Sequence, residues 1–170
     1  MKAIDLIRDT LTSADQGMAH IVEDLRAHPL LQPTPGAGNG GNHALWTLGH
    51  LAYLESQLPR IILGPSGEPS RYDHWATLFA TGTAPKTDGS QYPTFDEVLR
   101  ACRVLRAQTL ALLDQVGEAS LDERPKAVPP GFEDAMRTCG HAFMLIALHQ
   151  MVHYGQLTDV RRVAGLPPAF

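Results

Sequence analysis

Cysteine, long apolar runs and concentrated positive charge are all scarce in this chain of 170 residues. Its two cysteines, Cys102 and Cys139, are too few for the disulfide framework of a small secreted domain. Residues 1–17 are amphipathic with interspersed acids and lack the apolar stretch of a signal peptide. No apolar run approaches the roughly 20 residues that cross a membrane. We therefore expect a cytoplasmic protein with no membrane partner.

The charge balance excludes a further class of partner. Lys and Arg number 14 against 18 Asp and Glu, which gives a net charge of -4, and no segment concentrates the basic residues. A nucleic-acid surface needs concentrated positive charge, so we expect no nucleic-acid partner. The length and the 44% share of apolar residues fit a single domain over residues 1–170.

Apolar residues recur at steps of three and four in four segments, which is the pattern of amphipathic helices. No β-alternation of useful length is present. We therefore predict an all-α four-helix bundle. The predicted helices are residues 2–27, stopped by Pro29; residues 42–64, with Asn42 as N-cap and a kink or early end at Pro59; residues 94–117; and a last helix that starts between Phe132 and Thr138 and ends at Gly165.

Two connections between these helices are rich in residues that interrupt helices. Residues 31–42 are rich in Pro and Gly, and residues 64–93 form a long connection with at most one short helix around residues 74–80. A connection of that length can return the chain along the bundle, so the second and third helices can run parallel. The third helix begins cleanly, because Thr94 and Glu97 form a capping box.

The candidate functional residues are histidines, of which the chain has eight. His149 and His153 are four residues apart on the apolar stripe of the last helix, so both rings can reach one ion at about 2.0–2.1 Å. A pair at this spacing can also be two ordinary hydrogen-bonded histidines. Two polar rings on an apolar stripe need partners, since a buried unpaired polar group costs about 1–3 kcal/mol. Gln150 cannot act as a general base, which argues against a zinc protease.

The third ligand must come from another helix, and His50 is the preferred residue. It lies on the inward stripe of the second helix, whereas His43 is two turns away at the start of that helix. Gly49 and Gly155 adjoin the proposed ligands, and they indicate either close backbone approach to a metal or tight helix packing. Surface or hydrogen-bonded roles are expected for the remaining histidines, which are His20, His28, His74 and His141.

The residues around these histidines resemble a known family. Residues 46–51 (WTLGHL), residues 149–157 (HQMVHYGQL) and residues 161–167 (RRVAGLP) are similar to the DinB/YfiT-like superfamily of metalloenzymes. The resemblance implies an up-down-down-up bundle and a three-histidine site made by His50, His149 and His153. It also implies zinc or nickel as the ion, and a homodimer.

Relatives in that superfamily include thiol transferases and isomerases that use bacillithiol, mycothiol or glutathione. Our main hypothesis is therefore a metal-dependent transferase that joins a low-molecular-weight thiol to an electrophile. The alternatives are a metal-dependent hydrolase and a non-catalytic metal-stabilised binding or stress-response module. A fourth protein ligand, from His20, His141 or Cys139, would favour a structural metal. Trp46 and Tyr53 are candidates for pocket walls or for plain core packing, and no catalytic residue is assigned.

Overall fold

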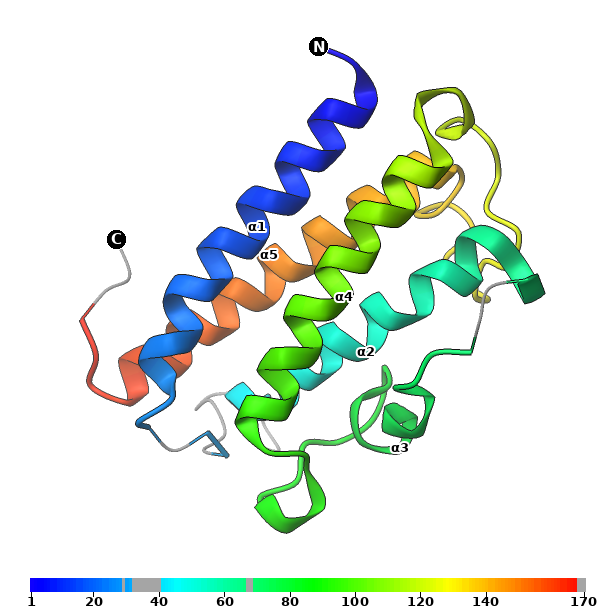
Figure 1. Cartoon of the computed structure of the whole chain (residues 1–170). Helices are drawn as coiled ribbons and strands as arrows, with labels where there is room; N and C mark the ends of the chain where they lie inside the picture. The colour runs from blue at the N-terminus through cyan, green and yellow to red at the C-terminus, as the bar shows by residue number, and fades with distance from the viewer. Residues whose placement is uncertain (29, 32–40, 67–68, 168–170) are drawn as a thin grey trace.

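The computed structural model describes residues 1–28, 30–31, 41–66 and 69–167, and this part of the chain is helical with no strand. Four long helices lie alongside one another, and a short helix in the long connection packs beside them (Figure 1). The helices are α1 (Ala3–Leu25), α2 (Ala44–Leu63), α3 (Ala76–Phe79), α4 (Phe95–Val116) and α5 (Cys139–Val163). Single 3-10 turns occupy Gly64–Ser66, Asp73–Trp75, Gly89–Gln91 and Glu118–Ser120.

The long helices pack in a fixed set of neighbours. α1 packs along α5, α2 packs along both α4 and α5, and α1 meets α4 only sparsely. These contacts are compatible with a four-helix bundle. The buried side chains form two apolar clusters, one around Leu48 and Leu157 and the other around Leu113 and Phe143. Among the described residues no helix is long and apolar enough to cross a membrane.

The boundaries of α4 agree with the sequence prediction. The Glu97 N–H donates to Thr94 Oγ1 at 3.3 Å, and the Thr94 N–H donates to Glu97 Oε2 at 2.8 Å, so the capping box is formed. Gly117 follows the helix with a φ of 69°, a backbone angle that glycine adopts without strain. α5 has Thr138 as its N-cap, which is the latest start that the sequence allowed.

One prediction about α2 is wrong, and another is narrowed. His43, not Asn42, caps the helix, because its Nδ1 accepts the Trp46 N–H at 3.0 Å. Of the two outcomes predicted at Pro59, a kink or an early end, the early end does not occur, because the helix runs on to Leu63 and Gly64 follows it. Proline in the last turn removes a single backbone donor, and the residues that follow, Ile61 and Ile62, are buried and keep that turn packed.

The long connection follows the predicted outline. Among the described residues of this connection one α-helix is present, α3, which lies within the predicted range of 74–80 and follows the 3-10 turn Asp73–Trp75. Phe79 at the end of α3 is fully buried against the bundle. The predicted stop at Pro29 and most of the predicted loop at 31–42 lie outside the described residues.

Candidate metal centre

Three histidines from two helices lie together in the structure. His50 on α2 and His153 on α5 are buried, and His149 is half-buried. One nitrogen from each of the three rings lies within 4.8 Å of the other two. The His50 ring centroid is 5.1 Å from that of His149 and 5.1 Å from that of His153. The predicted set is therefore brought together, although 99 residues separate His50 from His149 (149 − 50).

The spacing of these nitrogens fits a single ion. His149 Nε2 and His153 Nε2 are 3.1 Å apart. Two nitrogens that bind a tetrahedral ion at about 2.0–2.1 Å are separated by roughly 3.4 Å, so the pair is close to that geometry. Among the described residues, no other His, Cys, Asp or Glu belongs to the group. Three imidazoles are the donor set of an open site rather than a closed structural one.

His50 is positioned by the connection between α2 and α4. Its Nδ1 lies 2.7 Å from the backbone carbonyl oxygen of Phe79, which can only accept, so His50 carries its proton there. The Nε2 lone pair is then left for an ion. A Cβ on Gly49 would lie 2.2 Å from Cε1 of the Phe79 ring, so only glycine lets α3 approach this closely. Gly49 therefore allows tight packing of α3 against α2, and this packing places the Phe79 carbonyl oxygen next to His50.

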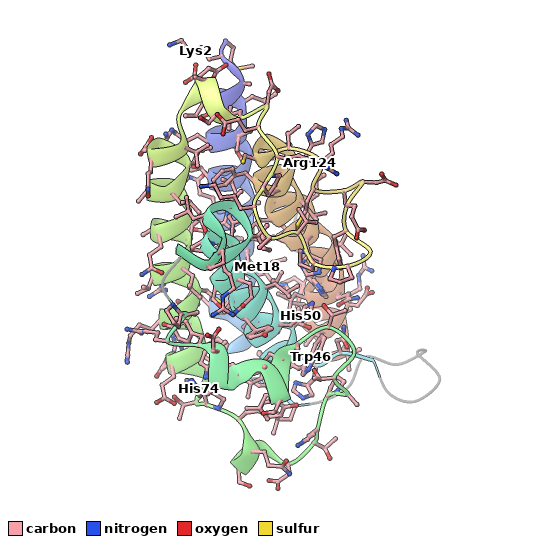
Figure 2. The ribbon with its side chains drawn as sticks, turned by 90° about the vertical axis from the view of Figure 1, so that its right-hand side faces the viewer. Lys2, Met18, Trp46, His50, His74 and Arg124 are labelled. Carbon is pink, nitrogen blue, oxygen red and sulfur yellow. The ribbon has the colours of Figure 1, made fainter. Side chains whose placement is uncertain are left out.

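Trp46 forms the other support of His50. The two rings stack with centroids 4.6 Å apart and planes 10° from parallel, one helical turn apart on α2. The indole Nε1–H donates to the carbonyl oxygen of Leu78 at 3.0 Å, which ties Trp46 to the same connection. Figure 2 shows Trp46 and His50 beside that connection. Trp46 thus holds a ligand candidate in place and is more than a core residue.

His153 is held by a short polar chain. Its Nδ1 lies 2.7 Å from Gln156 Oε1, and Asn42 Nδ2 donates to the same oxygen at 3.2 Å. Because the amide oxygen accepts, His153 also carries its proton on Nδ1 and keeps its Nε2 lone pair. An acceptor on the far ring nitrogen is the usual support of a metal-binding histidine.

Burial keeps all three rings neutral at neutral pH. It lowers the pKa of His50 and the pKa of His153, and burial together with the charges of the two neighbouring rings lowers the pKa of His149 to about 4. A neutral imidazole is the form that binds a metal. The chemistry of the donor set therefore fits a divalent ion.

A buried ion pair lies next to the histidines. Arg106 Nε is 2.9 Å from Glu55 Oε1, and Arg106 Nη2 donates to Glu55 Oε2 at 3.1 Å and to Gln150 Oε1 at 2.5 Å. Arg106 Nη1 also donates to the Leu11 carbonyl oxygen at 2.7 Å. Glu55 is thus paired with Arg106 and lies outside the histidine group.

The other histidines and the two cysteines lie elsewhere. His43 is fully buried, with Nε2 2.9 Å from the Lys86 carbonyl oxygen, and His141 pairs with Thr138 at the start of α5. His20 and His74 are exposed and His28 is half-buried. Cys102 and Cys139 are both free, in separate apolar clusters, so the pair does not form a disulfide.

Sequence reasoning missed the groups that orient the rings. The contact of Gln156 with His153 could have been predicted, because Gln156 lies three residues after His153 and therefore on the same face of α5. The Phe79 carbonyl had no such signal, since every residue has a backbone oxygen. Gly155 does not serve close approach, because a Cβ there would meet nothing within 4 Å.

These features define a helical protein with an open three-histidine site between two of its long helices. Comparison with known families then places the chain. The sequence model of the DinB superfamily matches residues 8–157, and the chain belongs to that superfamily. No curated protein matches the chain with significant similarity.

Proposed function

We propose that His50, His149 and His153 bind one divalent metal ion, zinc or nickel, and that the protein is a metal-dependent transferase acting on a low-molecular-weight thiol. The observation that carries the proposal is the convergence of three neutral imidazole nitrogens within 4.8 Å. Membership of the DinB superfamily supports a metal site at these positions. The up-down-down-up helix order and a cytoplasmic location belong to the same proposal.

The roles of the protein groups follow from their contacts. A divalent ion at this site supplies positive charge that favours the thiolate form of a thiol near neutral pH. Phe79 and Gln156 hold the His50 and His153 rings in the tautomer that binds, so little reorganisation is needed. In the transfer the thiol sulfur forms a bond to an electrophilic carbon while the S–H bond and one bond of that carbon, to a leaving group or a π bond, break. The atom that takes the electron pair of the broken carbon bond then accepts a proton.

The two alternatives are less well supported by the contacts. Hydrolysis needs an acid or base at the site, and of the carboxylates beside it Glu55 is paired with Arg106 and Asp15 lies on α1 outside the histidine group. A structural ion usually has four protein ligands, whereas the described group has three. His20, His141 and Cys139 are not part of it.

Elemental analysis tests the metal site directly. The purified protein is expected to hold about one equivalent of metal, and His153→Ala is expected to lose most of it. His20→Ala is the matched control, because His20 is exposed and outside the group. Equal metal content in His153→Ala and the unaltered protein would refute the site.

Activity is tested next with several thiols and a chromogenic electrophile. Turnover is expected in the unaltered protein and in His20→Ala, and it is expected to be lost in His153→Ala and after treatment with a chelator. Retention of metal by the unaltered protein without turnover of any thiol would favour the non-catalytic binding module.

Self-association is a further part of the proposal. Leu148, Met151 and Val152 are 54%, 49% and 65% exposed on one side of α5, which is an unusual apolar surface for a monomer. We expect the protein to sediment as a dimer, and Met151→Lys to shift it toward monomer. Leu6→Lys is the control, because Leu6 is an exposed apolar residue on α1 away from this surface. A monomeric unaltered protein would refute the dimer.

A further inference from the structure

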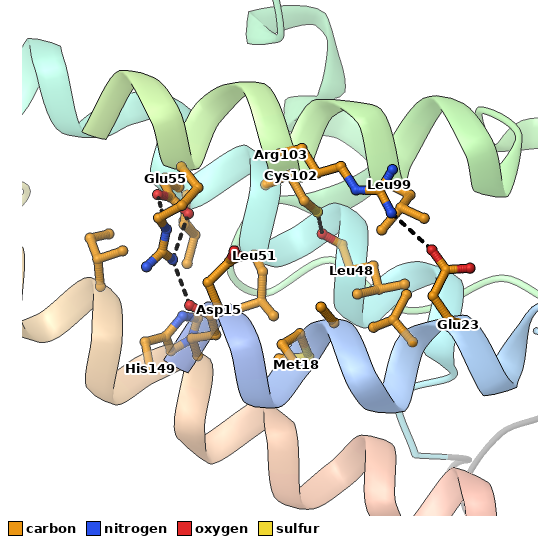
Figure 3. Close-up of a pocket in the computed structure, with 17 residues that line it drawn as sticks. Asp15, Met18, Glu23, Leu48, Leu51, Glu55, Leu99, Cys102, Arg103 and His149 are labelled. Atoms are coloured by element: carbon orange, nitrogen blue, oxygen red, sulfur yellow. Dashed lines mark hydrogen bonds and ion pairs between the residues drawn. The ribbon is translucent and has the colours of Figure 1, made fainter. Parts of the chain in front are cut away.

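A cavity lies inside the molecule next to the histidine group. It has a volume of about 80 Å³ and is bounded by side chains of α1, α2, α4 and α5. Its middle is apolar, with Met18, Leu51, Leu99 and Cys102 among its walls (Figure 3). His149 forms part of the wall, so a molecule in the cavity lies against one of the three imidazoles.

The cavity reaches solvent between α1 and α4, which meet only sparsely. Ala19, Glu23 and Arg103 line it there and are exposed. Arg103 Nη2 donates to Glu23 Oε1 at 2.8 Å across this opening, and Figure 3 shows the pair at the end of the cavity away from His149. Both side chains of the pair are about half or more exposed, so the pair is weak and can part.

The Gln150 amide is a neutral hydrogen-bond donor in the lining of the cavity, beside Arg106. Gln150 lines the cavity, and its amide orientation is determined by Arg106. A guanidinium only donates, so the Gln150 oxygen faces Arg106 and its NH2 group points the other way. Within the described part of the chain, no side chain or backbone group accepts from Gln150 Nε2. The buried ion pair of Arg106 with Glu55 thereby holds a donor ready for a ligand oxygen.

The size and polarity of the cavity indicate what it binds. A dry apolar cavity of about 150 Å³ holds benzene, so one of 80 Å³ holds a group of about four or five heavy atoms. Charged residues also line the cavity: Glu23 pairs with Arg103 at the opening, Glu55 pairs with Arg106, and Asp15 lines it from α1 (Figure 3). A short aliphatic chain with one acceptor oxygen matches the apolar middle and the Gln150 donor, whereas a free thiol of biological size is too large to be enclosed.

We infer that this cavity binds the electrophilic co-substrate as a short aliphatic carbonyl compound, whose oxygen accepts from Gln150 Nε2 and whose chain enters between α1 and α4. The inference rests on the proposed transferase function and names the substrate class of the same site. Gln150 is a binding residue in this scheme, and Arg106 and Glu55 are positioning residues that act through it.

Butanone is a suitable probe, since it has five heavy atoms and a carbonyl but does not alkylate thiols. Its binding is followed by chemical shifts of the protein amides, with 2-methyl-1-butene as the isostere that lacks the oxygen. Both probes are measured on the purified protein without added thiol. A protein that binds butanone but turns over no thiol would therefore separate this inference from the proposed function.

Two substitutions test the position and the donor. Ala19→Phe places a ring at the exposed opening and is expected to abolish binding of both probes. Gln16→Phe is its control, because Gln16 is exposed on α1 and does not line the cavity. Gln150→Met removes the donor at similar volume. It is expected to weaken butanone binding by about fivefold, as the loss of one neutral hydrogen bond would, and to leave the alkene unchanged.

Three outcomes would overturn the inference. They are absence of butanone binding to the unaltered protein, unchanged binding in Ala19→Phe, and equal weakening of butanone and the alkene in Gln150→Met. Ala19→Phe alters an exposed position, so the test remains decisive if Gln150→Met fails to fold.

Discussion

The buried pair of Arg106 and Glu55 offers the sharpest test of the energetics. Their side chains are only 7% and 8% exposed, so either charge would be poorly hydrated if its partner were removed. Arg106→Met would leave the Glu55 carboxylate buried with its Thr109 contact and without a cation. Breaking one side of a buried ion pair costs about 3–5 kcal/mol, so we expect a loss of that size in the free energy of unfolding at pH 7.

The pH dependence of the same variant has a definite sign. Burial raises the pKa of Glu55, and Arg106 opposes that rise. Without Arg106 the folded pKa lies further above the unfolded value, so folding favours the protonated acid. The destabilisation is then small at a pH below the unfolded pKa of about 4.3 and grows as the pH rises toward the folded pKa. Arg106→Met should therefore lose less stability, relative to the unaltered protein, at pH 5 than at pH 8.

The double variant Glu55→Leu, Arg106→Met separates the lost pair from the uncompensated charge. Replacement of both partners by apolar residues is often neutral or stabilising, so the double variant should be more stable than Arg106→Met alone. Urea denaturation at pH 5, 7 and 8 measures all three proteins. A loss below about 1 kcal/mol in Arg106→Met, or a double variant less stable than the single one, would refute this reasoning.

Three further predictions follow from single contacts. Gln156→Leu should weaken metal binding by about 10–100-fold through loss of the acceptor on His153, with unchanged helicity, and metal competition titration beside Gln16→Leu checks this. Gly49→Ala should destabilise the fold by about 1–3 kcal/mol, because the added Cβ would overlap Phe79. Gly155→Ala should stabilise α5 by up to about 1 kcal/mol, because its Cβ would meet nothing within 4 Å. Thermal melts of both variants measure these changes in stability. Burial raises the pKa of the Cys102 thiol to about 12, so about one thiol in 10⁴ is ionised at pH 8. A disulfide reagent should therefore modify Cys102 quickly only after denaturation. Fast modification of Cys102 in the folded protein would contradict this burial.

Much of the helical architecture could be predicted because its causes are local. The capping box at Thr94 and the glycine stop at Gly117 are determined by residues within a turn of each boundary. The N-cap of α2 and its continuation past Pro59 have a different origin. His43 rather than Asn42 caps the helix because its Nδ1 accepts the Trp46 N–H, and the last turn survives past Pro59 because Ile61 and Ile62 are buried.

The candidate site also has features with local causes and features that depend on distant residues. The pairing of His149 and His153 on one face follows from the helical repeat, since residues four apart lie one turn above each other. The sequence also indicated His50 through its apolar stripe. The sequence also predicted that the rings face the bundle interior, and what remained open was which of their nitrogens is free.

By itself, then, the amino-acid sequence determined the long helices, the histidine pair on α5 and a preference for His50, because periodicity and capping act over a few residues. Only the tertiary structure decided that the Phe79 carbonyl orients His50, that Arg106 joins Glu55 to Gln150, and that a cavity lies beside His149. These contacts join residues that are distant in sequence. They depend on how the connection between α2 and α4 folds back and how closely Gly49 lets it approach, which no local pattern specifies.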